Sequence, residues 1–191
     1  MLKALIFDCF GVIYPDTLAI VGRDFLKLHD PRRQILRDLR VQADRGFISR
    51  NEFWDQAAKI MGTNRTELNK RLGAVQGADW QLLEYIKTLR QTYKTAVLSN
   101  VGSDFMARVF APKKSTDYFD ELVLSFETGF LKPDRAAYET AAERLGCAAA
   151  ECMMIDDQER HCDGAVAAGM KAIHYHDFVQ FKHELGRLIQ S

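Results

Sequence analysis

The stretch ALIFDCFGVIY, residues 4–14, decides how the rest of the chain is interpreted. Residues 2–7 are typical of a buried parallel β-strand, because the run is short, mostly apolar and followed by polar and glycine residues. Asp8 comes directly after it, and Phe10 stands two positions further on. A lone carboxylate at a strand end is usually a helix cap or a loop hydrogen-bond acceptor, so the other strands must show whether Asp8 is functional.

Later apolar runs predict further strands. They span residues 95–100, 121–125, 152–156 and 171–175. Helical patterns lie between these runs, one beginning at Asp79 as N-cap and another ending at Gly146. Strands that alternate with helices imply βαβ crossovers and a parallel sheet covered on both faces. The expected fold class is therefore α/β, with a Rossmann-like three-layer core.

Residues 15–78 break this alternation and favour helices throughout. Ser49 and Glu52 have the spacing of a capping box, and Gly62 is the expected end of the helix that they begin. We expect a small helical cap inserted after the first strand. The chain would then consist of a core domain, residues 1–14 and 79–191, and a cap, residues 15–78. A cap beside Asp8 would exclude water and select substrates.

The composition excludes several classes of protein. The chain has 191 residues, and its 26 Lys and Arg balance its 26 Asp and Glu, so no basic excess indicates nucleic-acid binding. Neither a signal peptide nor a membrane span is visible, so we expect a cytoplasmic protein without a membrane partner, and a monomer by default. Four cysteines lack C-x-x-C spacing and are expected to be small buried thiols rather than zinc ligands: Cys9, Cys147, Cys152 and Cys162.

Polar side chains occur where the expected strands end, or shortly after. They are Asp8, Ser99, Asn100, Lys132, Asp156 and Asp157. The carboxyl ends of parallel strands meet at one edge of the sheet, where ligands bind in such folds, and a loop would bring Lys132 to the same edge. Three carboxylates beside a lysine and a hydroxyl suit a hard cation and an anion together. Mg²⁺ prefers oxygen ligands and usually bridges carboxylates to a phosphate.

Five segments together resemble the haloacid dehalogenase superfamily with a small helical cap of the first type. They are FDCFGV (7–12), GFISRNEFW (46–54), LSN (98–100), GFLKPDRAAYETAAERLG (129–146) and IDDQERHCDGAVAAGM (155–170). The resemblance covers essentially the whole chain. It implies a phosphoric monoester hydrolase in which Asp8 attacks phosphorus and forms an aspartyl-phosphate, so that one difficult transfer becomes two easier ones.

The same resemblance assigns the remaining site residues. Ser99, Asn100 and Lys132 would bind the transferred phosphoryl group, and Lys132 would also restrain the charge of the nucleophile. Mg²⁺ would be held by Asp8, the main-chain carbonyl of Phe10, Asp156 and Asp157, the last directly or through water. The cation would screen the repulsion between an anionic nucleophile and an anionic substrate.

Phe10 departs from the family pattern. Most phosphatases of the superfamily have a second aspartate there, which protonates the leaving oxygen and later activates water. An aromatic ring cannot transfer a proton, and the loss of such help typically costs about two to four powers of ten in rate. We expect a Mg²⁺-dependent phosphatase acting on a small phosphorylated metabolite, with a sugar phosphate among the candidates. Its proton would come from a cap residue or water, unless the leaving group needs none.

Two other functions remain open. A 2-haloacid dehalogenase has an aromatic residue at the position of Phe10, because halide leaves without protonation. Such enzymes need no metal and resemble S-S-N in the segment that corresponds to residues 155–170. This chain has Asp156 and Asp157 there, so the dehalogenase alternative is disfavoured. A noncatalytic binding or regulatory relative is the second alternative, in which the polar strand ends serve only the fold.

Several further residues are weaker candidates. Asp16 and Tyr14 lie on the path into the cap, so either could touch substrate or replace the missing acid. His161 is expected at the surface or behind the metal ligands, and His174 and His176 are expected to have a structural role at a strand end. Arginines of the insertion could reach an anionic substrate, among them Arg23, Arg40 and Arg45.

Overall fold

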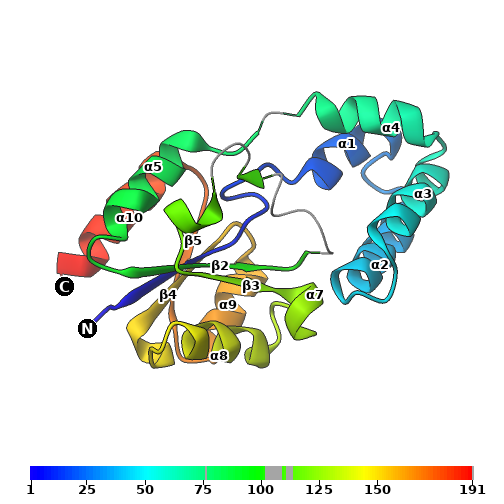
Figure 1. Cartoon of the computed structure of the whole chain (residues 1–191). Helices are drawn as coiled ribbons and strands as arrows, with labels where there is room; N and C mark the ends of the chain where they lie inside the picture. The colour runs from blue at the N-terminus through cyan, green and yellow to red at the C-terminus, as the bar shows by residue number, and fades with distance from the viewer. Residues whose placement is uncertain (76, 102–108, 111–113, 191) are drawn as a thin grey trace.

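The computed structural model describes residues 1–75, 77–101, 109–110 and 114–190. Its centre is a sheet of five parallel strands in the order β3-β2-β1-β4-β5 (Figure 1). The strands are β1 (Ala4–Phe7), β2 (Lys94–Ser99), β3 (Glu121–Leu124), β4 (Cys152–Asp156) and β5 (Lys171–His174). The predicted α/β class is confirmed. β1 lies in the middle, paired with β2 on one side and β4 on the other, so Asp8 follows the most protected strand.

Helices cover both faces of the sheet and produce the predicted three layers. Helices α5 (Trp80–Leu89) and α10 (Phe178–Gln190) pack on one face, and α8 (Arg135–Arg144) and α9 (Glu159–Ala167) pack on the other (Figure 1). Leu5 and Phe7 point toward the first pair, whereas Ala4 and Ile6 point toward the second. This alternation along β1, apolar on both faces, explains the continuous hydrophobic run in the sequence.

The strands end slightly earlier than the sequence predicts in three places. β2 ends at Ser99 rather than residue 100, and the side chain of Asn100, directly after the strand, bonds to the main chain of Lys132. β3 ends one residue early, because Ser125 begins the short helix α7 (Ser125–Thr128). β5 ends at His174 rather than residue 175. Two single-turn 3₁₀ helices, Ser115–Asp117 and Ala149–Glu151, lead into β3 and β4.

Of the five described helices that lie between β1 and β2 in sequence, the first four gather beyond one end of the sheet (Figure 1). They are α1 (Thr17–Phe25), α2 (Arg32–Asp44), α3 (Arg50–Met61) and α4 (Arg65–Gly73). Val21, Leu39, Phe53 and Leu68 belong to a hydrophobic cluster that these helices make among themselves. We call this segment the cap. Its exact bounds at 14/15 and 78/79 stay a prediction.

Helix α3 begins with the capping box and ends at the glycine that the sequence predicts. Ser49 accepts a hydrogen bond from the main-chain N–H of Glu52, and the Glu52 carboxylate accepts one from the N–H of Ser49. The helix ends at Gly62, whose φ of +72° is a conformation that glycine adopts without steric cost. Within the described ranges, no helix combines the length and the apolar character needed to cross a membrane.

Candidate active site

Polar groups from three neighbouring strands meet at the carboxyl edge of the sheet. Asp8 follows β1, Ser99 ends β2 and Asp156 ends β4. All three residues are buried, with at most 4% of their surface exposed. Because the strands are parallel and adjacent, their register alone brings these groups together.

Lys132 joins the two carboxylates from a loop between α7 and α8. Its Nζ lies 2.8 Å from Oδ1 of Asp8 and 2.6 Å from Oδ2 of Asp156. Burial disfavours the charged lysine, but Asp8 and Asp156 outweigh burial and raise the pKa of Lys132. The lysine is therefore a fixed positive charge between two buried carboxylates.

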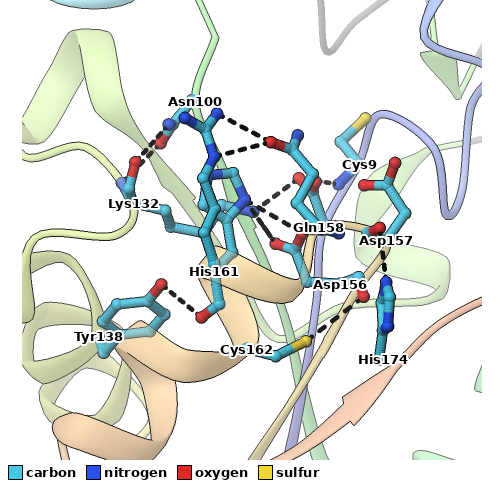
Figure 2. A network of polar contacts seen from close by, with 12 residues as sticks. Cys9, Asn100, Lys132, Tyr138, Asp156, Asp157, Gln158, His161, Cys162 and His174 are labelled. Carbon is cyan, nitrogen blue, oxygen red and sulfur yellow. Dashed lines mark hydrogen bonds and ion pairs between the residues drawn. The ribbon is translucent and has the colours of Figure 1, made fainter.

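Asn100 determines where this lysine lies. Its Oδ1 accepts a hydrogen bond of 2.8 Å from the main-chain N–H of Lys132, and its Nδ2 donates one of 2.9 Å to the Lys132 carbonyl. Figure 2 shows the paired contact. The amide thus fastens the lysine loop to the end of β2. As predicted, Asn100 is brought into the site, and its side chain acts on the lysine backbone.

Asp156 has a full set of donors. Its carboxylate accepts from Lys132, from the main-chain N–H of Gln158 at 2.9 Å, and contacts Nδ1 of His161 at 3.1 and 3.2 Å (Figure 2). Burial opposes ionisation of this carboxyl, but Lys132 and His161 outweigh burial and lower the pKa of Asp156 to about 2. Asp156 is thus an ionised, fully coordinated anion.

Asp157, unlike Asp156, has a carboxylate oxygen that accepts no hydrogen bond from the described residues. Its Oδ1 is buried, and no hydrogen-bond partner for it exists among the described residues. Burial, together with the charges of Asp8 and Asp156, raises the pKa of Asp157 to about 6. Gly11 makes room for it, because a Cβ at residue 11 would lie 2.3 Å from Oδ2 of Asp157. An unpartnered buried carboxylate needs a positive partner, and a metal ion is one candidate.

Asp8 faces the same edge. Its Oδ1 accepts a short hydrogen bond of 2.6 Å from the main-chain N–H of Cys9. Burial raises the pKa of Asp8, with the charge of Asp156 in the same direction and that of Lys132 against it. A further cation beside Asp8 would favour its ionised form.

The hydroxyl of Ser99 is a second buried group without a partner in the part of the chain that the structure describes. It belongs to a residue with only 1% of its surface exposed, at the end of β2 beside β1. A buried hydroxyl rarely stays unpaired, so a ligand oxygen is its expected partner. Together, a fixed ammonium, an unpaired hydroxyl and an unpaired carboxylate suit an oxyanion bound beside a cation.

A cavity of about 550 Å³ opens above these groups, between the sheet edge and the cap. Asp8, Lys132 and Asp157 line it from the core, and Arg40 and Asp44 line it from α2. The cavity has the size of a small-molecule site. Five aspartates and five arginines line it, which favours a charged and polar occupant; the arginines are Arg33, Arg37, Arg40, Arg45 and Arg160.

Residues 2–169 match the family described as haloacid dehalogenase-like hydrolase. The chain belongs to this hydrolase family. A curated relative, the D-ribitol-5-phosphate phosphatase of Bacteroides thetaiotaomicron, is 25% identical over 206 positions that cover all of both chains. A family enzyme from the same organism, crystallised with magnesium and inorganic phosphate, has a TM-score of 0.74 at 22% identity, covering 95% of this chain and 99% of that one. Magnesium is the ion that the sequence motifs predict here.

A dehalogenase is also similar in fold. The 2-haloacid dehalogenase of Pseudomonas syringae pv. Tomato has a TM-score of 0.60 at 22% identity, covering 92% of this chain and 86% of that one. This likeness shows the shared hydrolase fold alone. The side chains at the sheet edge must therefore distinguish the two reactions.

Asp156 and Asp157 are both candidate metal ligands in this haloacid dehalogenase-like site. Asp8, Asp156 and His161 bring ligand atoms within 4.8 Å of one another. However, the ammonium of Lys132 already lies within 2.8 Å of both carboxylates, so positive charge is supplied there. Asp157 has no such partner, which makes it the better ligand for a cation beside Asp8.

The weaker candidate site residues lie in different surroundings in the structure. Asp16 lines the cavity, whereas Tyr14 lines a different one, which lies along the loop after Asp8. His161 is buried with 2% exposure, contacts Asp156 and lines the cavity, so it lies within the site rather than at the surface. His174 contacts the main-chain carbonyl of Asp157 at 3.0 Å, as expected for a structural residue.

The insertion arginines differ from one another. Arg40 and Arg45 line the cavity, whereas Arg23 is exposed on α1. The cysteines Cys9, Cys152 and Cys162 are buried, Cys147 is partly buried, and all four are free thiols. The sequence interpretation missed Asp44, a buried carboxylate on the cavity wall. Its only signal was its spacing, because Leu36, Arg40 and Asp44 follow one another at four-residue intervals on one face of α2.

Proposed function

We propose that the chain is a Mg²⁺-dependent phosphatase that acts on a small phosphorylated metabolite through a phosphoryl group carried on Asp8. The observation that carries this proposal is the pair of unpartnered buried oxygens on either side of Asp8, Oγ of Ser99 and Oδ1 of Asp157. One suits a phosphoryl oxygen and the other suits a cation. Full-length similarity to a curated phosphatase supports the same reaction.

The phosphoryl group would be held from the β2 side. The Ser99 hydroxyl would donate a hydrogen bond to one phosphoryl oxygen, and Lys132 would contact another while it remains paired with Asp8. Asn100 would keep the lysine in this position through its two bonds to the lysine main chain. A fixed ammonium stabilises the charge that develops on the phosphoryl oxygens during transfer.

Mg²⁺ would be held by Asp8, the main-chain carbonyl of Phe10 and Asp157. These residues provide the oxygen ligands that the ion prefers, and Asp156 would act mainly by holding Lys132. Three carboxylates against one ammonium leave the ionised cluster, Asp8, Asp156, Asp157 and Lys132, with a formal charge of −2, which a divalent cation balances. When bound, the ion would screen the substrate's negative charge from the nucleophile.

The reaction would proceed in two steps. A carboxylate oxygen of Asp8 attacks phosphorus, and the bond from phosphorus to the substrate oxygen breaks. Water then attacks the phosphorus of the aspartyl-phosphate, which releases inorganic phosphate and restores the Asp8 carboxylate. Lys132 stays charged throughout, because its two carboxylate neighbours raise its pKa.

The substrate would be small and polar, since the cavity measures about 550 Å³ and carries five arginines on its walls. Phosphorylated sugars and sugar alcohols fit this description. The curated relative is named for D-ribitol 5-phosphate, which makes such compounds the first to test.

The decisive experiment is a phosphate-release assay on a panel of sugar and sugar-alcohol phosphates, with Mg²⁺ and with a chelator. We expect Mg²⁺-dependent turnover that Asp8→Asn lowers by about three powers of ten or more. Asp38→Asn is the matched control, because Asp38 is an exposed carboxylate on α2 that does not line the cavity. No turnover on the panel by folded protein would favour a binding protein instead.

The dehalogenase alternative has its own assay. Halide release from 2-chloropropionate without metal would support it, and we expect none. The reason is Asp157, whose buried Oδ1 has no partner among the described residues and would gain one from a cation. Metal-independent halide release would contradict the proposed phosphatase.

A further inference from the structure

The proposed reaction needs a proton donor that the segment around the nucleophile, residues 7–12, does not supply. Phe10 stands where most phosphatases of the superfamily have their acid, and its ring cannot transfer a proton. The phosphoryl group would be held against the core by Ser99 and Lys132, so the leaving oxygen must point toward the cap. A replacement acid must therefore lie on the cap side of the cavity.

Asp44 is the buried cap carboxylate that meets this requirement. It is the last residue of α2, its side chain is 11% exposed, and it lines the same cavity as Asp8. It also lines a second, smaller cavity of about 80 Å³ together with Phe10. The aromatic side chain and this carboxylate therefore border the same space, above the expected nucleophile.

The backbone of Asp44 is fixed to the core. Oγ of Ser125, the first residue of α7, donates a hydrogen bond of 2.6 Å to the Asp44 carbonyl. The same Oγ accepts one of 3.0 Å from the N–H of Val101, two residues after Ser99. One buried hydroxyl thus links the end of α2 to the loop after β2. A group that transfers protons must be positioned this closely.

We propose that the carboxyl group of Asp44 is the general acid and base of this enzyme, in place of the residue that Phe10 replaces. This assignment rests on the proposed phosphatase function. It makes Asp44 a catalytic residue of that reaction, although it lies on the cap rather than on the first motif.

The charges around Asp44 suit the role. Burial raises its pKa to about 7, with Arg40 opposing the shift and Asp16 and Asp8 adding to it. The Arg40 contact is long, with Nε 3.7 Å from Oδ2. A group whose pKa is close to neutral can both give and accept a proton at the pH of the cell.

The other acidic candidate in the cap is less suitable. Asp16 uses both oxygens, since Oδ1 accepts from the N–H of Ala19 at 3.1 Å and Oδ2 pairs with Arg40 at 3.0 Å. Its carboxylate therefore caps α1 and holds the arginine. Arg40 in turn lies over the Phe10 ring, 5.7 Å from its centroid, between the two aspartates.

The protons balance over the two steps. As the bond from phosphorus to the leaving oxygen breaks, that oxygen takes the proton of the Asp44 carboxyl group and departs as an alcohol. The resulting Asp44 carboxylate removes a proton from water, whose oxygen forms a bond to phosphorus while the bond to Asp8 breaks. Asp44 is then protonated again, and inorganic phosphate leaves.

Leaving-group dependence tests this role. p-Nitrophenolate leaves without a proton, whereas an alkoxide does not. Asp44→Asn should therefore lower kcat/KM for a sugar or sugar-alcohol phosphate about 10²- to 10⁴-fold, and change the first step with p-nitrophenyl phosphate little. The second step still needs a base, so rapid mixing should show a burst of about one equivalent of p-nitrophenol followed by slow turnover.

The pH profile gives a second readout. The wild-type kcat/KM for a sugar or sugar-alcohol phosphate should fall as pH rises past neutrality, because the acid loses its proton, and Asp44→Asn should lack this limb. The charged groups that face Asp44 are Arg40 on its own helix, Arg45 directly after that helix, Asp16 before α1, Arg50 on α3 and Asp8 from the core.

The controls separate the possible failures. Asp38→Asn, on the same helix but exposed, should keep wild-type kinetics with both substrates. Equal losses with both substrates and no burst would show a merely structural role for Asp44, and unchanged kinetics would also overturn the proposal. Inactive wild-type protein would instead refute the phosphatase function on which it rests.

Discussion

Nζ of Lys132 lies 2.8 Å from Oδ1 of Asp8, and the two side chains are only 1% and 6% exposed. The same nitrogen is 2.6 Å from Asp156, so one buried cation serves two buried anions. An arrangement of this kind is costly to disrupt, because each partner that remains would be an uncompensated charge out of contact with water.

Lys132→Met should therefore destabilise the fold as well as abolish phosphate release. Loss of one member of a buried ion pair typically costs about 3–5 kcal/mol of unfolding free energy. Urea denaturation measures this change. Lys87→Met, at an exposed position of α5, is the control and should stay within about 0.5 kcal/mol of wild type. Equal stabilities of the two variants would show that the buried ion pairs do not hold this site together.

Gly11→Ala should disturb the site because the added Cβ would clash with the side chain of Asp157. The new Cβ would lie 2.3 Å from Oδ2 of Asp157, and the φ of +94° adds backbone strain. We expect a loss of about 2–4 kcal/mol in unfolding free energy and a weaker affinity for Mg²⁺. Thermal unfolding at several Mg²⁺ concentrations measures both.

Gly129→Ala provides the comparison for backbone strain alone. Its φ is +76°, and nothing lies within 4 Å of the position of the added Cβ. This variant should lose about 1–2 kcal/mol and keep the wild-type response to Mg²⁺. If Gly11→Ala behaved like Gly129→Ala, the contact with Asp157 would not matter.

Much of this site is predictable from the sequence, because parallel strands bring their carboxyl ends together whatever the detailed packing. Asp8, Ser99 and Asp156 could be placed at one edge from strand patterns alone. The division of roles between Asp156 and Asp157 could not. It depends on which neighbouring carboxylate receives the ammonium of Lys132, a donor 24 residues away from Asp156 in sequence.

The cap was less predictable for a related reason. The capping box at Ser49 depends on residues three positions apart, so its sequence signal is local and correct. Asp44 depends on contacts with the core, among them the hydrogen bond from Ser125, 81 residues later in the chain. Helix periodicity shows that Asp44 shares a face with Leu36, but not that this face borders the cavity.

Asp157→Asn should remove stabilisation by Mg²⁺ while leaving the fold intact. Binding of the ion to the folded state raises the melting temperature of the wild type, in proportion to the logarithm of ion concentration above Kd. The amide variant should show little rise. Asp163→Asn, at an exposed position of α9, should respond as the wild type does. A full Mg²⁺ response in Asp157→Asn would exclude this residue as a ligand.

Stability without Mg²⁺ should fall as pH rises from about 4 toward 7. Burial raises the pKa of Asp44 to about 7. Between its unfolded and folded pKa values the folded protein binds a proton that the unfolded chain does not, so raising pH favours unfolding. Asp44→Asn removes this contribution and should be about 2–4 kcal/mol more stable relative to wild type at pH 8 than at pH 4. Urea titrations at both pH values would contradict the assignment if that difference stayed constant.

Ser125→Ala should loosen the connection between the cap and the core. Its hydroxyl donates to the Asp44 carbonyl at 2.6 Å and accepts from the Val101 N–H at 3.0 Å, and both bonds are buried. The alanine variant leaves both backbone groups without this partner, which should cost about 1–3 kcal/mol.

Ser125→Ala should also lower the rate of catalysis, because the end of α2 is no longer held above the sheet edge. We expect kcat/KM for a sugar or sugar-alcohol phosphate to fall more than kcat/KM for p-nitrophenyl phosphate, since only the leaving oxygen of the former needs the proton of a well-placed Asp44. Thr88→Ala is the matched control, because it removes a hydroxyl that donates to the Tyr85 carbonyl at 2.7 Å on the exposed side of α5. If Ser125→Ala lost stability but lowered both kcat/KM values equally, the hydroxyl would support the fold without positioning the acid.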